Sequence, residues 1–179
     1  QIMENWCSQP EMLRLFAKHY QTGEIIPQIL IDKIVASGKF NQGFETVEYL
    51  AASILDMDYH VLSTAEGLDV NKFETEQMQK IGLIEEIIPR YKSTYFNHIW
   101  GGGYAAGYYS YIWAEVLDAD AFQAFVESGD IFNATIGASF RENILSKGGT
   151  GDAMTMYKTF RGKEPAIEPL LKKRGLIAE

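Results

Sequence analysis

The stretch FETVEYLAASILDMDYHV, residues 44–61, carries the clearest structural pattern in the chain. Its apolar side chains recur at steps of three or four residues: Phe44, Val47, Leu50, Ile54, Met57 and Val61. Because an α-helix completes a turn every 3.6 residues, such steps place these side chains on one face of a helix. The spacing predicts a long amphipathic helix.

Further helices are expected on both sides of this stretch. Ser8 and Glu11 have the spacing of a capping box, and Pro27 can open a helix. A helix is also predicted over residues 70–81, and helical patterning resumes at Tyr104. Breaks are expected at residues 128–129, 148–149 and 162, and a final helix over 165–175. Since no segment alternates apolar and polar residues, the predicted fold is mainly α.

The composition narrows the function classes. The chain has 179 residues, enough for one domain. Its net charge of -8 would repel a phosphate backbone, so nucleic acid is not an expected partner. The single cysteine, Cys7, excludes an internal disulfide and fits a reducing compartment. We expect a cytoplasmic protein, with the periplasm as the alternative.

A membrane span is not expected either. Residues 93–114 carry no formal charge and are long enough to invite that interpretation. Three adjacent glycines, Asn97, His98 and several hydroxyl groups leave too little continuous apolar surface for a span.

A second unusual stretch is HIWGGGYAAGYYSYIW, residues 98–113. On a helix running from Tyr104, one polar stripe would form, and a different flank would face the core. The predicted stripe is Tyr104, Tyr108, Tyr111 and Glu115, and the predicted core flank is Tyr109, Ile112, Trp113 and Val116. Phenols donate hydrogen bonds to carbonyl oxygens, and glycines let a ligand approach the backbone. The pattern is typical of a peptide or acyl site, or alternatively of core tyrosines with satisfied hydroxyls.

The histidines give no metal site within the chain. His19, His60 and His98 lie far apart, and none has a histidine partner four residues away. His98 differs from the others because it adjoins the glycines and the tyrosines.

The segment NHIWGGGYAAGYYSY, residues 97–111, closely resembles the C-terminal signature of the thimet oligopeptidase family of zinc metallopeptidases. Within that family it is most similar to the bacterial peptidyl-dipeptidases and oligopeptidases. Supporting similarity lies in QIMENW (1–6), HYQTG (19–23) and FRGKEP (160–165). The resemblance implies that residues 1–179 form the C-terminal helical portion of a zincin-type catalytic domain.

The resemblance also implies a zinc cofactor whose ligands lie outside this chain. The family binds zinc with an HExxH helix and a glutamate on a second helix. No HExxH occurs here, and the third ligand is expected just upstream of Gln1. The missing N-terminal portion of the enzyme is therefore an expected partner, and the chain alone should be inactive. Glu4 is a candidate for contacting and orienting the residues that bind the metal; alternatively, it is a solvated surface residue.

Carried over from the family, the substrate-facing residues are His98, Tyr104 and Tyr111. Tyr111 would donate a hydrogen bond to the oxyanion, with Tyr104 as a second donor and His98 holding the substrate backbone. Gly102 and Gly103 would admit the peptide strand, and Tyr108 is a further candidate for substrate binding.

The implied substrates are short peptides, which would lose C-terminal dipeptides or, alternatively, be cut internally. An enzyme that releases dipeptides must bind a free carboxylate, and Arg141, Lys147 and Arg161 are the candidate cations. The alternative function is a helical module that binds peptides or proteins without catalysis.

Overall fold

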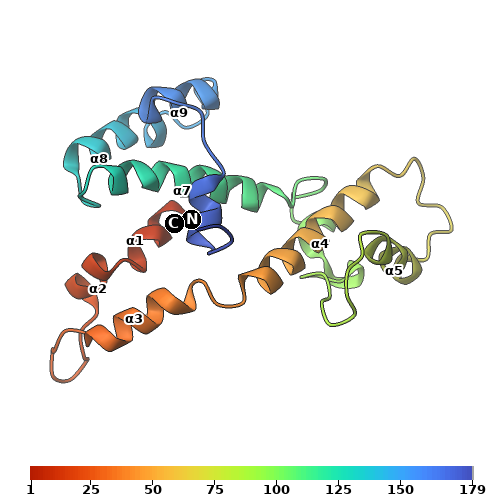
Figure 1. The fold of residues 1–179 in the computed structure, drawn as a ribbon. Helices are drawn as coiled ribbons and strands as arrows, with labels where there is room; N and C mark the ends of the chain where they lie inside the picture. Colours follow the sequence, from red (N-terminus) through yellow and green to blue (C-terminus); the bar gives the residue numbers. More distant parts are fainter. Residues whose placement is uncertain (179) are drawn as a thin grey trace. The chain divides into compact units, whose positions relative to one another are not determined.

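The computed structural model describes residues 1–178, and within them the chain is helical (Figure 1). Lys18 and Ile25 form an isolated antiparallel bridge, and residues 1–178 contain no β-strand longer than this bridge. The chain divides into two compact units, residues 1–40 with 114 onward, and residues 41–113. The mainly α fold predicted from the sequence is confirmed.

The first unit contains helices from both ends of the chain. They are α1 (Ile2–Cys7), α2 (Pro10–Phe16), α3 (Gln28–Ser37), most of α7 (Ser110–Glu127), α8 (Ala134–Phe140), the π-helical segment η2 (Arg141–Leu145), α9 (Ala153–Arg161) and α10 (Glu168–Lys173). Trp6 of α1 packs edge-on against Phe122 and Phe125 of α7, with ring centroids 4.7 and 4.9 Å away. Asn5 donates a hydrogen bond to Asp118 at 2.8 Å, so α1 is held against α7 by apolar and polar contacts.

The second unit carries the residues singled out by the sequence. It contains α4 (Gln42–His60), α5 (Val70–Lys80), the short 3-10 helix η1 (Ser93–Tyr95), α6 (Asn97–Trp100) and the first residues of α7. The Asp69 side chain accepts hydrogen bonds from the amides of Asn71 and Lys72 and so caps α5. The helices predicted over 44–61 and 70–81 are confirmed.

The buried face of α4 is not the face that predicted the helix. The regularly spaced apolar residues, from Phe44 to Met57, each remain between 38% and 40% exposed, and Val61 is 72% exposed. The core of the second unit instead contains Ala51, Ala52, Leu55, Tyr59, Phe73, Met78, Phe96, Ile99 and Tyr108. Small side chains at Ala51 and Ala52 leave room for the aromatic residues that pack there.

Several predicted helix boundaries are wrong. The Ser8 side chain does not cap α2, whose N-cap is Gln9, because Ser8 ends α1 and its hydroxyl faces the carbonyl of Asn5. The final helix begins at Glu168 rather than at residue 165. The predicted breaks hold, since Gly129, Gly148 and Gly162 adopt the positive φ that ends a helix.

Within residues 1–178, none of the helices is long and apolar enough to cross a membrane.

Candidate functional site

A glycine turn follows α6 and is closed by backbone hydrogen bonds. The amides of Gly101 and Gly102 donate to the carbonyl of Asn97, at 2.9 and 2.8 Å, and the amide of Tyr104 donates to the carbonyl of His98 at 3.0 Å. Gly103 has a φ of +83°, which favours glycine. A Cβ on Gly102 would lie 2.9 Å from the Cα of His98. Gly102 is therefore needed for close packing and Gly103 for backbone conformation.

His98, Tyr104 and Tyr111 form a group that we call the tyrosine–histidine cluster. The rings of Tyr104 and Tyr111 stack with centroids 5.0 Å apart and planes 20° apart. The His98 ring lies 5.8 Å from Tyr104 and 6.2 Å from Tyr111, between centroids. His98 also packs against Tyr91 at 4.8 Å. The structure thus brings together the three residues that the family resemblance places toward the substrate.

The expected helical stripe of tyrosines is wrong, although two of its members, Tyr104 and Tyr111, do lie together. Helix α7 begins at Ser110, so Tyr104 and Tyr108 lie in the turns before it. Three neighbouring glycines and Gly107 favour turns over helix in this segment. Glu115, predicted at the end of the stripe, forms an ion pair with Arg174 in the first unit.

The burial of the neighbouring aromatic residues also differs from expectation. Tyr108 is only 3% exposed and belongs to the core, whereas Tyr109 and Trp113 are about half exposed. Val116 is buried, as predicted for the core flank. Because the Tyr108 ring is enclosed, we do not place it among the residues that could contact a substrate.

The two central phenols are held in their protonated forms. A hydrogen bond with Tyr104, together with burial, raises the pKa of Tyr111 to about 12. Burial, with a contribution from nearby Tyr91, raises the pKa of Tyr108 to about 12, against an opposing hydrogen bond from Arg90. Tyr111 keeps its proton at neutral pH, as a phenol of ordinary pKa also does, and can act as a hydrogen-bond donor.

Sequence reasoning missed the side chains that hold this segment. Asp56, on α4, accepts hydrogen bonds from the amides of Ala106 and Tyr108. Tyr49, on the same helix, donates to the carbonyl of Tyr108 and accepts from the amide of Ile112. Trp100 is held by its indole N–H, which donates to the carbonyl of Ser93 at 2.7 Å. No local sequence pattern marks Asp56, because it is buried on a face of α4 other than the one that the spacing of apolar residues predicts.

The other predicted site residues lie in the first unit. Glu4 is exposed on α1. Arg161 forms ion pairs with Asp120 at 3.2 Å and with Glu127 at 2.7 Å. These partners compete with a substrate carboxylate for Arg161. Arg141 and Lys147 are exposed.

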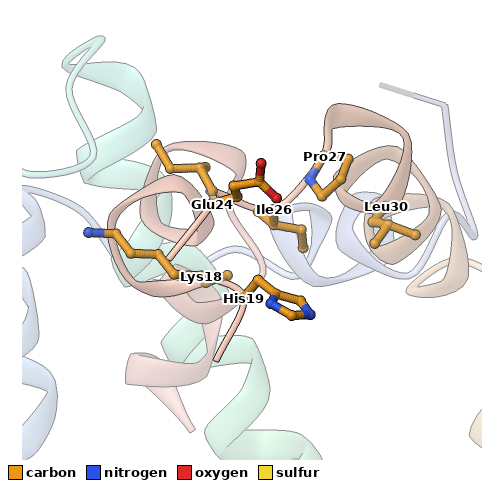
Figure 2. A pocket seen from close by; sticks show the side chains of 8 residues that line it. Lys18, His19, Glu24, Ile26, Pro27 and Leu30 are labelled. Atoms are coloured by element: carbon orange, nitrogen blue, oxygen red, sulfur yellow. The ribbon is translucent and has the colours of Figure 1, made fainter. Parts of the chain in front are cut away.

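A cavity of about 320 Å³ lies in the first unit beside the turn that follows α2. Figure 2 shows Lys18, His19, Glu24, Ile26, Pro27 and Leu30 around it. The Nδ1 atom of His19 accepts hydrogen bonds from the amides of Gln21 and Thr22, at 3.4 and 3.2 Å. His19 therefore stabilises its own turn.

The chain belongs to peptidase family M3, a family of metallopeptidases, whose model matches residues 1–176. It is 43% identical to the dipeptidyl carboxypeptidase of Escherichia coli K12 over 178 residues, which cover 98% of this chain and 26% of that protein. Identity is 40% to oligopeptidase A of the same organism over 182 residues, 98% of this chain and 26% of that protein. Identity to saccharolysin of Saccharomyces cerevisiae is 32% over 179 residues, 98% of this chain and 25% of that protein. The family resemblance is confirmed, and the chain spans about a quarter of the length of these relatives.

A metallopeptidase family implies a bound metal ion, and the described residues do not fit one. Among residues 1–178, no group of three or more His, Cys, Asp or Glu side chains is arranged to hold a metal. The sequence also lacks the HExxH pattern. The tyrosine–histidine cluster is a set of donors and rings, not a ligand set.

Proposed function

We propose that this chain is part of a peptidase that hydrolyses short peptides, and that the tyrosine–histidine cluster is its substrate-contacting surface. The observation that carries the proposal is the geometry of the Tyr111 phenol, whose ring is stacked on Tyr104 and lies beside His98 at a glycine turn. Membership of peptidase family M3 supports hydrolysis of a peptide bond as the reaction.

In this proposal Tyr111 stabilises the charge that develops on the peptide carbonyl oxygen during attack. A fixed phenolic donor aimed at that oxygen stabilises the transition state more than the ground state. Tyr104 is the second donor, because its hydroxyl lies within hydrogen-bond distance of the Tyr111 hydroxyl and its one proton can be given to a substrate oxygen in place of their mutual bond. His98 binds the substrate backbone, and Gly102 and Gly103 keep side chains away from the peptide.

We further propose that residues 1–179 form the C-terminal segment of the catalytic domain. Zinc would then be bound by a different part of a full-length family M3 polypeptide, which is the partner of this chain. The single Cys7 supports the cytoplasm as the compartment, with the periplasm as the alternative.

The proposed products are C-terminal dipeptides. The relative with 43% identity is named a dipeptidyl carboxypeptidase, and another is named an oligopeptidase. Of the three candidate cations for the substrate carboxylate, Arg141 and Lys147 remain better suited than the ion-paired Arg161.

The test uses a full-length family M3 polypeptide that contains this sequence. It is incubated with acetylated oligopeptides that carry a free or an amidated C-terminus, and the products are identified by mass spectrometry. We expect free-acid peptides to shorten by two residues and amidated peptides to resist. Internal cuts in both substrates would assign oligopeptidase activity instead. Peptides that bind and remain intact would favour the non-catalytic binding module.

A substrate-binding role for His98 has its own test in the same assay. His98→Ala should raise KM more than it lowers kcat, because His98 is proposed to bind the backbone before and during the reaction. His60→Ala is unsuitable as a control because His60 contacts Asp56, so His19→Ala, in the other unit, serves instead.

A further inference from the structure

The carboxylate of Asp56 is completely buried on α4 and is fully used by neighbouring groups. One oxygen accepts a hydrogen bond from the amide of Ala106 and the other from the amide of Tyr108, both at 2.9 Å. The Nδ1 atom of His60 lies 2.9 Å from the first oxygen. A buried carboxylate is tolerated only when it is paired and hydrogen-bonded, and Asp56 meets this condition through the turn before α7.

Tyr49 binds the next part of the same segment. Its hydroxyl donates to the carbonyl of Tyr108 at 2.5 Å and accepts from the amide of Ile112 at 3.2 Å. Its ring also packs on that of Tyr108, with centroids 5.2 Å apart. Tyr49 precedes Asp56 by two helical turns, so the two side chains leave α4 on the same side. Together they hold the backbone on both sides of Tyr108.

This segment needs anchoring because its backbone is unusual. Ala106 has a φ of 52°, a left-handed conformation that L-residues other than glycine rarely adopt. The amide of Ala106 is one of the two that Asp56 binds. Such conformations persist only where the surroundings determine them. Tyr104 precedes the anchored segment and Tyr111 lies inside it.

We propose that Asp56, assisted by Tyr49, is a positioning residue for the tyrosine–histidine cluster. Asp56 does not touch a substrate, because its side chain is buried. It fixes the turn over residues 106–108, and Tyr49 joins that turn to the start of α7, so that the Tyr104 ring stacks on Tyr111. The hydroxyl of Tyr111 is thereby held where its donor function requires. This inference rests on the function proposed above.

The first test measures the geometry in the 179-residue chain. Asp56→Asn keeps the size of the side chain but replaces one acceptor with a donor that faces a backbone N–H. By NMR, we expect amide exchange at Ala106 and Tyr108 to accelerate at least about 10-fold and the ring contacts between Tyr104 and Tyr111 to weaken. Asp58→Asn, on the same helix, is the matched control. Unchanged ring contacts in folded Asp56→Asn would overturn the proposal.

Tyr49→Phe is the second variant, and it keeps the aromatic ring in the core. It should accelerate exchange of the Ile112 amide and weaken the Tyr104–Tyr111 contacts less than Asp56→Asn does. This variant keeps the proposal testable if Asp56→Asn fails to fold. Unchanged contacts and exchange in Tyr49→Phe would then overturn it.

The second test separates positioning from stability in the full-length peptidase. A small misplacement of a catalytic group costs about 100-fold in rate, so Asp56→Asn should lower kcat by about that factor with KM within a few-fold of wild type. Asp58→Asn should retain wild-type kcat. If Asp56→Asn lowers the Tm but the folded enzyme keeps its kcat, Asp56 is merely structural and the proposal fails.

Tyr111→Phe in the same assay distinguishes the two failures. If Tyr111→Phe lowers kcat and Asp56→Asn does not, the positioning role is wrong and the proposed function stands. If Tyr111→Phe leaves kcat unchanged, the oxyanion role proposed for Tyr111 is wrong. The NMR contacts between Tyr104 and Tyr111 then decide alone whether Asp56 positions the rings.

Discussion

The ring of Tyr104 stacks on the ring of Tyr111 at a centroid distance of 5.0 Å, although only Tyr111 belongs to helix α7. Two phenols in this arrangement share a hydrogen bond, and that bond stabilises the protonated form of Tyr111. The turn between them, rather than a helical repeat, creates the pair.

The Tyr104–Tyr111 pair predicts a titration shift. Tyr104→Phe removes the hydrogen-bond partner, so the pKa of Tyr111 should fall from about 12 toward the ordinary value of 10.0. NMR of chain labelled at tyrosine can follow the Tyr111 ring once its signal, one of ten, is assigned by its loss in Tyr111→Phe. A pKa of Tyr111 that is unchanged in Tyr104→Phe would show that another group causes the shift.

The same shift has a consequence for stability. The pKa of Tyr111 is raised in the folded chain, so its stabilising contribution is complete below about pH 10 and is lost as the pH rises toward about 12. Denaturation should be measured across that pH range. The wild-type chain should lose this stabilising contribution as the pH rises, whereas Tyr111→Phe should show no such loss from position 111.

The glycine turn predicts different costs at neighbouring positions. Gly102→Ala should destabilise the chain most, because its Cβ would meet the backbone of His98 at 2.9 Å. Gly103→Ala should cost about 1 kcal/mol from its positive φ. Gly101→Ala is the control, since its Cβ would approach only the Asn97 side chain, at 3.2 Å. Equal unfolding free energies for all three variants, measured by denaturant titration, would contradict the turn geometry.

The two ion pairs of Arg161 are predicted to contribute unequally to the free energy of unfolding. Removing Arg161 leaves the buried charge of Asp120 poorly paired, so Arg161→Met should lower the unfolding free energy by about 3–5 kcal/mol. Glu127→Gln should cost less than about 1 kcal/mol, because the Glu127 side chain is 48% exposed. Denaturant titration measures both, and a larger loss in Glu127→Gln would refute the ranking.

The ion pair between Arg161 and Glu127 also makes the stability of the fold depend on pH. The hydrogen bond from Arg161 holds the pKa of Glu127 below its usual value of 4.5. The stabilising contribution of Glu127 is therefore present above about pH 4.5 and is lost as the pH falls through its lowered pKa. In Glu127→Gln this acid-side loss should be smaller.

Metal binding gives a prediction for the 179-residue chain itself. Because residues 1–178 contain no suitable cluster of ligands, the purified chain should neither bind zinc tightly nor hydrolyse peptides. Metal analysis and a peptide-cleavage assay measure these properties. Stoichiometric zinc with turnover that a chelator abolishes would show that the family comparison misplaces the ligands.

The sequence was sufficient to predict the helices whose signals are local. The spacing of apolar residues in α4, the cap at Asp69 and the glycines that end α7 and α9 each act over a few residues. The buried face of α4 was not predictable in this way, because it depends on which aromatic rings pack against Ala51 and Ala52.

The candidate site was predictable only in part. The family motif identified His98, Tyr104 and Tyr111, and the structure brings them together. The start of α7 was placed too early, since helical spacing alone ignores the competing hydrogen bonds that Asp56 offers to the amides of Ala106 and Tyr108. Contacts between α4 and the turn are long-range, so no local pattern announces them.

The kcat of Tyr111→Phe in the full-length peptidase tests the central claim most directly. The variant removes only the hydroxyl and should keep the ring stacked on Tyr104. Loss of one oxyanion donor costs about 10²- to 10³-fold in turnover, so kcat should fall by that factor while KM moves only a few-fold and metal content stays unchanged. Tyr109→Phe, at an exposed neighbour, should retain wild-type kcat. A near-normal kcat with a raised KM in Tyr111→Phe would contradict the account and reduce Tyr111 to a substrate-binding contact.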